Sequence, residues 1–193
     1  MFRLIVSRPL SESVIARWTT SAEREQARGF APARRAEWLS WRAVVRQEVT
    51  AATGCTVPEV RIVYNEVGAP VVMDTPIHLA VSHCRGSIAV AFSEAPCAVD
   101  IEPLDRDFER VASRYMTAGE RALSADARWS AVTWCAKETL YKYAGRRELD
   151  LLHDLRIERV DFHAGTLVGR IAGGKPLTLR FLMFADRVAV YIA

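Results

Sequence analysis

The chain has 193 residues, of which 50% are hydrophobic and 25% are charged. This length and composition fit one compact domain or two small, closely packed ones, and no apolar run approaches the roughly 18 to 20 residues of a membrane helix. A net charge of +3 is too small to indicate a nucleic-acid-binding protein, although it suits an acidic or phosphate-rich partner.

Cysteine and lysine usage gives two further indications. The four cysteines form no C-x-x-C pair, which argues against a zinc site or a disulfide framework and favours reduced thiols. The opening MFRLIVSRPL is too short and too charged for a signal peptide, so the expected location is the cytoplasm. There are 23 arginines but only three lysines, and two of these, Lys137 and Lys142, stand five residues apart. Their stretch is a candidate for chemistry that uses a compact ammonium group.

The first half of the chain is expected to begin with a strand, FRLIV, and a helical region from about residue 11 to 53. Late in this region two tryptophans share one stripe at 100° per residue. Arg35, Arg42 and Arg46 lie within about 20° of one another on the neighbouring stripe, so the helix is expected to present three guanidinium groups in a row. Such a row is either a solvated helix face or a phosphate clamp.

Two strand pairs are expected next. VRIVYNEVGAPVV predicts a strand, a Gly-Pro-bearing turn and a second strand, and IHLAVSHCRGSIAVAFS predicts a hairpin around Arg85-Gly86. Ser82 and His83 end a strand beside this turn. A histidine in such a place is either a structural hydrogen-bond donor or part of a binding site.

The second half opens with the strand CAVDIE, which Pro103 ends. Thr117 and Glu120 have the spacing of a capping box at the start of a helix, and a further helix is expected from about residue 129 to Gly145. Four strand-like segments follow. Because the order of elements repeats, we expect an α+β protein built from two similar subdomains, residues 1–96 and 97–193.

Two carboxylates in CAVDIE are candidate metal ligands. Residues two apart in a strand point to the same face, so Asp100 and Glu102 project together, roughly 6.6 Å apart along the backbone. Magnesium prefers oxygen ligands and needs few carboxylates when a substrate phosphate supplies the rest. The alternative is a half-buried strand with Val99 and Ile101 inward and both acids solvated.

The helical stretch WCAKETLYKYAG carries a third acid. Its predicted buried stripe consists of Val132, Cys135, Ala136, Thr139, Leu140 and Tyr143. Glu138 and Lys142 share the opposite side, where they are either a common i, i+4 surface pair or the acid and the cation that complete a magnesium site for phosphate chemistry.

In order, GAP, VSHC, VDIE and WCAKETLYK resemble the signature of the 4′-phosphopantetheinyl transferases, specifically the Sfp-like, pseudo-dimeric class of the holo-acyl-carrier-protein synthase superfamily. The resemblance spans nearly the whole chain, from the arginine helix to the last strand. It implies two α/β subdomains related by pseudo-two-fold symmetry, the first holding coenzyme A and the second carrying the metal-site acids. It also implies Mg²⁺-dependent transfer of the phosphopantetheine arm of coenzyme A to a serine of an apo acyl or peptidyl carrier protein, with release of 3′,5′-ADP.

The same resemblance assigns roles to single residues. Asp100, Glu102 and Glu138 are expected to hold magnesium, Glu138 also being the group that activates the attacking serine. Lys142 is expected to neutralise phosphate charge. The expected coenzyme contacts are Arg35, Arg42, Ser82, His83, Lys137 and Lys142. No cysteine is needed as a nucleophile, and a monomer that binds neither nucleic acid nor membrane is expected.

The sequence departs from the family pattern at four positions: Ala69 replaces a lysine, Cys84 a serine, Ala98 a glycine and Cys135 a serine or threonine. The first two affect expected coenzyme contacts, whereas every charged position of the expected metal site is present. Two other functions stay open at this point. One is a non-enzymatic module that binds a carrier protein or another acidic partner, and the other is a different magnesium-dependent pyrophosphate or nucleotide enzyme.

Overall fold

The computed structural model describes residues 2–193, which divide into two compact units, Met1–Ala95 and Pro96–Ala193. The units are described separately below. Both combine helices with antiparallel strands, so the chain is of the mixed α and β class that the sequence predicts. No helix in residues 2–193 combines the length and the apolar character needed to cross a membrane.

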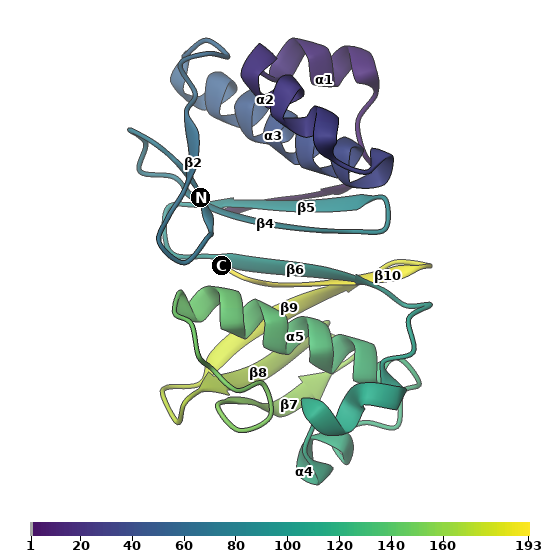
Figure 1. Ribbon diagram of the computed structural model, residues 1–193. Coiled ribbons are helices and arrows are strands. Elements are labelled where there is room, and N and C mark those ends of the chain that lie inside the picture. Colours follow the sequence, from purple (N-terminus) through teal and green to yellow (C-terminus); the bar gives the residue numbers. More distant parts are fainter. Residues whose placement is uncertain (1) are drawn as a thin grey trace. The chain divides into compact units, whose positions relative to one another are not determined.

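Unit 1 contains a three-stranded antiparallel sheet with strand order β1-β5-β4. Its helices lie on one side of this sheet (Figure 1). The strands of unit 1 are β1 (Phe2–Ser7), β2 (Ile62–Tyr64), β3 (Pro70–Val72), β4 (His78–Cys84) and β5 (Ser87–Ser93), with β2 and β3 forming a separate ribbon. The helices are α1 (Glu12–Trp18), α2 (Ser21–Gln26) and α3 (Pro32–Thr53), with a 3-10 turn at Ala27–Gly29.

Local sequence signals explain the long helix of unit 1. Pro32 begins α3, where a missing N–H costs nothing, and Gly54 ends it with a left-handed φ of 76°. The apolar stripe of α3, which includes Trp38, Trp41 and Val45, is buried with side chains of β5 in one core cluster. The helix is therefore held by burial of this stripe as well as by its own propensity.

The turn between β4 and β5 is the predicted two-residue hairpin. Arg85 and Gly86 both have positive φ, 35° and 74°, as the tight turns favoured in hairpins require. Cys84 pairs with Ser87 directly across the turn, which places His83 opposite Ile88. The turn thereby fixes the position of the histidine at the end of β4.

Unit 2 contains a five-stranded antiparallel sheet with strand order β6-β10-β9-β8-β7. The strands are β6 (Ala98–Pro103), β7 (Leu155–Asp161), β8 (Thr166–Ile171), β9 (Leu177–Met183) and β10 (Arg187–Ile192). The helices are α4 (Ala118–Arg121) and α5 (Trp129–Ala144), and a 3-10 helix spans Glu109–Arg114. Helix α5 lies along one face of the sheet (Figure 1).

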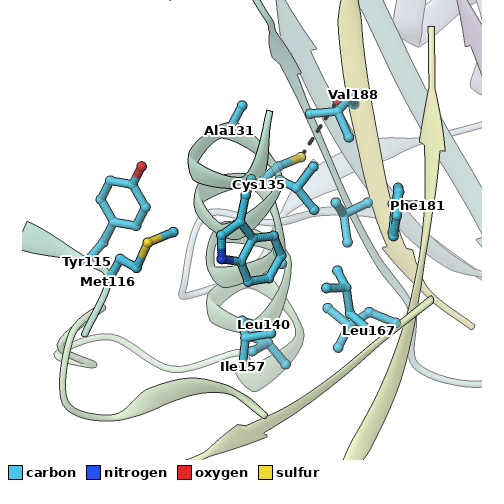
Figure 2. Close-up of a cluster of buried hydrophobic side chains, with 14 of the residues drawn as sticks. Tyr115, Met116, Ala131, Cys135, Leu140, Ile157, Leu167, Phe181 and Val188 are labelled. Atoms are coloured by element: carbon cyan, nitrogen blue, oxygen red, sulfur yellow. Dashed lines mark hydrogen bonds between the residues drawn. The ribbon is translucent and has the colours of Figure 1, made fainter. Parts of the chain in front are cut away.

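The core of unit 2 lies between α5 and the sheet. Figure 2 shows Ala131, Cys135 and Leu140 of α5 together with strand residues such as Leu167 and Val188. The Cys135 thiol also donates a hydrogen bond to the Val188 carbonyl, at 3.8 Å. This packing fixes the rotation of α5 about its axis and therefore determines which of its side chains face β6.

The predicted limits of α5 and the predicted capping box are confirmed. Helix α5 ends at Ala144, with Gly145 in the left-handed conformation, and Thr117 and Glu120 form both hydrogen bonds of a capping box. Within the predicted buried stripe of α5, Tyr143 is only partly buried, whereas Lys137, outside that stripe, is fully buried. The helix is thus more enclosed than its apolar pattern indicates.

Candidate active site

Strand β6 holds two candidate metal ligands on the face that α5 covers. Asp100 and Glu102 lie opposite Val190 and Val188 of β10, and both of these valines belong to the core beneath α5. Asp100 is only 5% exposed. The alternative of a half-exposed strand with solvated acids is therefore contradicted, because α5 encloses the face that bears them.

Lys142 of α5 neutralises Asp100. Its Nζ donates a hydrogen bond of 2.7 Å to Asp100 Oδ1 and another of 3.2 Å to the Val99 carbonyl. Burial lowers the pKa of Lys142, but the charge and the hydrogen bond of Asp100 oppose this effect and the net shift is upward. Lys142 is thus held as an ammonium group against β6, instead of forming a surface pair with Glu138.

Glu102 is held by an aromatic and a basic side chain. Trp134 Nε1 donates a 2.8 Å hydrogen bond to Glu102 Oε1, and Arg106 Nη1 lies 3.6 Å from Oε2. Burial, and then the charge of Asp100, raise the pKa of Glu102 to about 7, even though Trp134 and Arg106 favour the ionised form. The environment therefore disfavours a negative charge on Glu102, and an additional cation would relieve this.

Glu138 belongs to the same group of acids. Burial raises the pKa of Glu138, and the nearby Asp100 charge raises it further. The Glu138 charge in turn contributes to the upward shift of Glu102. Three carboxyl groups thus repel one another in one part of unit 2, with Lys142 and Arg106 compensating part of their charge.

The three acids are of the chemical type that binds magnesium, but their present geometry is not that of a metal site. All three acids offer oxygen atoms, and a bound cation would lower the electrostatic cost of ionising them. Within residues 2–193, no three His, Cys, Asp or Glu side chains are gathered in an arrangement that would hold a metal ion. Two of the acids instead receive hydrogen bonds from Lys142 and Trp134, and metal binding would require rearrangement of these carboxylates.

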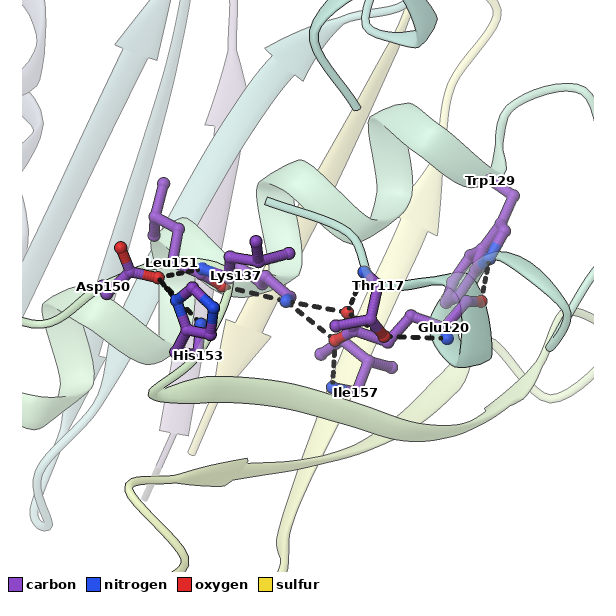
Figure 3. Close-up of polar contacts among 9 residues, drawn as sticks. Thr117, Glu120, Trp129, Lys137, Asp150, Leu151, His153 and Ile157 are labelled. Carbon is purple, nitrogen blue, oxygen red and sulfur yellow. Dashed lines mark hydrogen bonds and ion pairs between the residues drawn. The ribbon is translucent and has the colours of Figure 1, made fainter. Parts of the chain in front are cut away.

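Lys137 lies next to Glu138 in sequence but in a different environment. It is fully buried, and its Nζ contacts both carboxylate oxygens of Glu120, at 2.8 and 3.0 Å, and the Leu151 carbonyl at 2.9 Å (Figure 3). Glu120 also accepts hydrogen bonds from Thr117 and from the Ile157 amide. The Lys137 ammonium therefore links α5 to α4, β7 and the segment before β7.

The candidate coenzyme residues Ser82 and His83 lie at the end of β4 in unit 1. Ser82 is buried, and the His83 side chain is 35% exposed. His83 Nδ1 lies 2.9 Å from Oε2 of Glu37, an acid of α3. This contact could not be predicted from sequence patterns, because it joins residues that are 46 positions apart.

The arginine row of α3 is not a solvated face. Arg35 is exposed as expected, but Arg42 and Arg46 are each only 3% exposed, so the prediction of three presented guanidinium groups is wrong for these two. Glu23 of α2 contacts both, at 3.6 Å from Arg42 and 2.8 Å from Arg46. The Arg42 guanidinium also stacks 3.9 Å from the ring centroid of Trp38.

Burial opposes nucleophilic activation of two cysteines, Cys97 and Cys135. Burial raises the pKa of Cys97 to about 11, and it raises that of Cys135 well above its ordinary value. A thiol is nucleophilic as the thiolate, and these environments oppose its formation.

Four residues with clear structural roles were not predicted as parts of a site: Glu37, Arg106, Glu120 and Trp134. Glu120 was detectable only as a helix cap, and Trp134 only as the first letter of the W-x-x-K-E stretch. Glu37 and Arg106 carried no signal, because their partners are set by tertiary packing. Asp100, Glu102, Glu138 and Lys142 are brought together within unit 2, whereas Arg35, Arg42, Ser82 and His83 belong to unit 1.

One family of known proteins is similar to the second half of this chain. Residues 96–192 match the family model of the 4′-phosphopantetheinyl transferase superfamily. The matched range covers unit 2 except for its last residue, and it includes β6 and α5. No curated protein matches the chain.

Proposed function

The chain belongs to the 4′-phosphopantetheinyl transferase superfamily, and from this membership we propose that it transfers the phosphopantetheine arm of coenzyme A to a serine of an apo acyl or peptidyl carrier protein. The observation that carries the proposal is the acid group of Asp100, Glu102 and Glu138 beside Lys142, since all four lie in the matched range. We further propose the Sfp-like class, with two related halves in one chain.

Asp100, Glu102 and Glu138 would hold the magnesium ion. When bound, the ion supplies positive charge that stabilises phosphate oxygens. The raised pKa values of Glu102 and Glu138 support this assignment, because they show that the folded chain concentrates negative charge where it is poorly solvated.

Glu138 and Lys142 take the catalytic roles in the proposal. The serine oxygen of the carrier attacks the β-phosphorus of coenzyme A, a new oxygen–phosphorus bond forms, and 3′,5′-ADP leaves with the electrons of the broken bond. Glu138 accepts the serine proton as a general base. Lys142, kept charged by Asp100, offsets charge on the phosphates.

The remaining proposed coenzyme contacts are Arg35, Arg42, Ser82, His83 and Lys137. Exposure supports the assignment for Arg35 and His83. Arg42, Ser82 and Lys137 are buried, and for Lys137 every contact described above lies within unit 2. We therefore expect Lys137 to act through the position of α5 more than through contact with the coenzyme.

The proposal is tested by incubating the protein with coenzyme A, Mg²⁺ and several apo carrier proteins and measuring the intact mass of each carrier. A gain equal to one phosphopantetheine arm on at least one carrier is expected, together with release of 3′,5′-ADP. The gain should vanish with EDTA and in Asp100→Asn. Release of 3′,5′-ADP without a carrier would indicate a hydrolase instead, and absence of any product would reject the transferase.

A further inference from the structure

Glu37 is a buried carboxylate with two assigned partners in unit 1. Its side chain is 8% exposed, Oε2 lies 2.9 Å from His83 Nδ1, and Oε1 accepts a 2.6 Å hydrogen bond from the Gly86 amide. Both oxygens are thus engaged, as a buried charge requires. One side chain of α3 therefore fixes the histidine and the adjacent hairpin turn together.

This geometry determines the protonation pattern of the histidine ring. A carboxylate can only accept hydrogen bonds, so the Nδ1 that faces Glu37 must carry a proton. In the neutral ring Nε2 then holds the lone pair, and in the charged ring it becomes a donor. A phosphate oxygen needs a donor, and with Nδ1 donating to Glu37 the ring offers one at Nε2 when both nitrogens carry a proton.

We propose that Glu37 is a positioning residue for coenzyme binding, which holds His83 so that Nε2 meets a phosphate oxygen of the ligand. The inference rests on the proposed function, because it takes His83 as a coenzyme contact. The backbone supports it, since Gly86 lies at a turn with a φ of 74° and its amide is oriented toward Glu37. The Arg8 guanidinium is 3.5 Å from the Gly86 carbonyl and adds positive charge at the same turn.

The variant Glu37→Gln separates positioning from simple packing. The amide has nearly the same shape, but only its oxygen can accept the Gly86 amide hydrogen, so its NH₂ group must face His83. His83 Nδ1 then becomes an acceptor and the proton of the neutral ring moves to Nε2. Nitrogen NMR of the imidazole in the protein without coenzyme should therefore show Nδ1 protonated in the wild type and Nε2 protonated in the variant.

The kinetic effect should fall on coenzyme binding. The neutral ring of the variant can still donate from Nε2, so a charge-assisted hydrogen bond is replaced by a neutral one. This predicts about a fivefold rise in the KM for coenzyme A and in its Kd, with kcat within about twofold of the wild type. Glu37→Asp, which keeps the charge, should restore part of the affinity. Glu48→Gln is the matched control, because Glu48 is also on α3 but pairs with Arg3 and should leave KM unchanged.

The outcomes separate this inference from the proposed function. If calorimetry shows that the wild-type protein does not bind coenzyme A, both the proposed function and this role of Glu37 are wrong. A wild type that binds coenzyme A, with Glu37→Gln showing the wild-type tautomer or an unchanged KM, overturns the role of Glu37 alone. A higher KM equally present in Glu48→Gln would show a general loss of charge on α3 and would also overturn it.

Discussion

Replacing Lys137 by Met should destabilise the protein strongly while affecting coenzyme binding little. The substitution removes the ammonium that contacts both oxygens of Glu120, which is itself only 4% exposed. Hydrogen bonds from Thr117 and Ile157 would remain, but no cation would balance the buried carboxylate. Breaking a buried ion pair in this way costs about 3 to 5 kcal/mol.

Urea unfolding followed by tryptophan fluorescence measures this loss. A typical domain is stable by about 5 to 15 kcal/mol, so a cost of this size lowers the midpoint clearly. Lys175→Met is the matched control, because Lys175 is exposed and its loss should change the free energy of unfolding by less than about 0.5 kcal/mol. The double variant with Glu120→Gln should recover part of the stability, since both charges are then removed.

One result would refute this reasoning. If Lys137→Met unfolds like the wild type but its KM for coenzyme A rises about tenfold, Lys137 contacts the ligand and the ion pair with Glu120 is not what holds α5 in place.

Three further predictions follow from the acid group and the helix packing. In the folded protein the pKa of Glu102 is about 7, against an ordinary 4.5, so its ionisation costs stability as the pH rises through this range. The free energy of unfolding of Glu102→Gln, measured by urea titration, should therefore exceed that of the wild type by about 3 kcal/mol at pH 8 and equal it at pH 4. The variant should also lose transfer activity. Glu138→Gln should lower kcat at least about 100-fold without destabilising the fold, since the pKa of Glu138 is also raised and its ionisation costs stability; a retained kcat would remove Glu138 as the base. Gly169→Ala should cost about 1 to 3 kcal/mol, because its Cβ would lie 2.9 Å from Leu140 and 3.1 Å from a carbonyl of β7, whereas Gly119→Ala, which has more space, should melt like the wild type.

Local signals predicted the backbone well. Helix α5 follows from a 3.6-residue pattern that ends at a glycine able to adopt positive φ, and the β4–β5 hairpin follows from Arg85-Gly86 between alternating strands. These features depend on neighbours within a few residues. They could be predicted because backbone sterics and apolar periodicity act over that range.

The environment of the site could be predicted only in part. Strand alternation placed Asp100 and Glu102 on one face, but it favoured Val99 and Ile101 as the inward pair. In the structure Val99, Ile101 and Asp100 are all buried. Which face a helix covers is decided by contacts distant in sequence, such as that between Asp100 and Lys142, and periodicity does not encode them.

The prediction that the arginine row of α3 lies at the surface was wrong for the same reason. The periodicity of α3 gave the angular positions of Arg42 and Arg46 but contained no information on α2. Glu23 of that short helix contacts both guanidinium groups. A solvated stripe and a buried ion-pair network have the same pattern of letters, and only tertiary structure separates them.

Helix α5 has a consequence for how the protein can vary. Nine of its side chains are buried, and others on the same sixteen residues face the acids of β6. A substitution that adapts the helix to a new ligand therefore also changes the packing of the core. Such a change at one turn of the helix needs compensating changes at the next turn. Chemical innovation is easier at exposed positions of the unit such as Lys175, which lies outside the core cluster and the acid group.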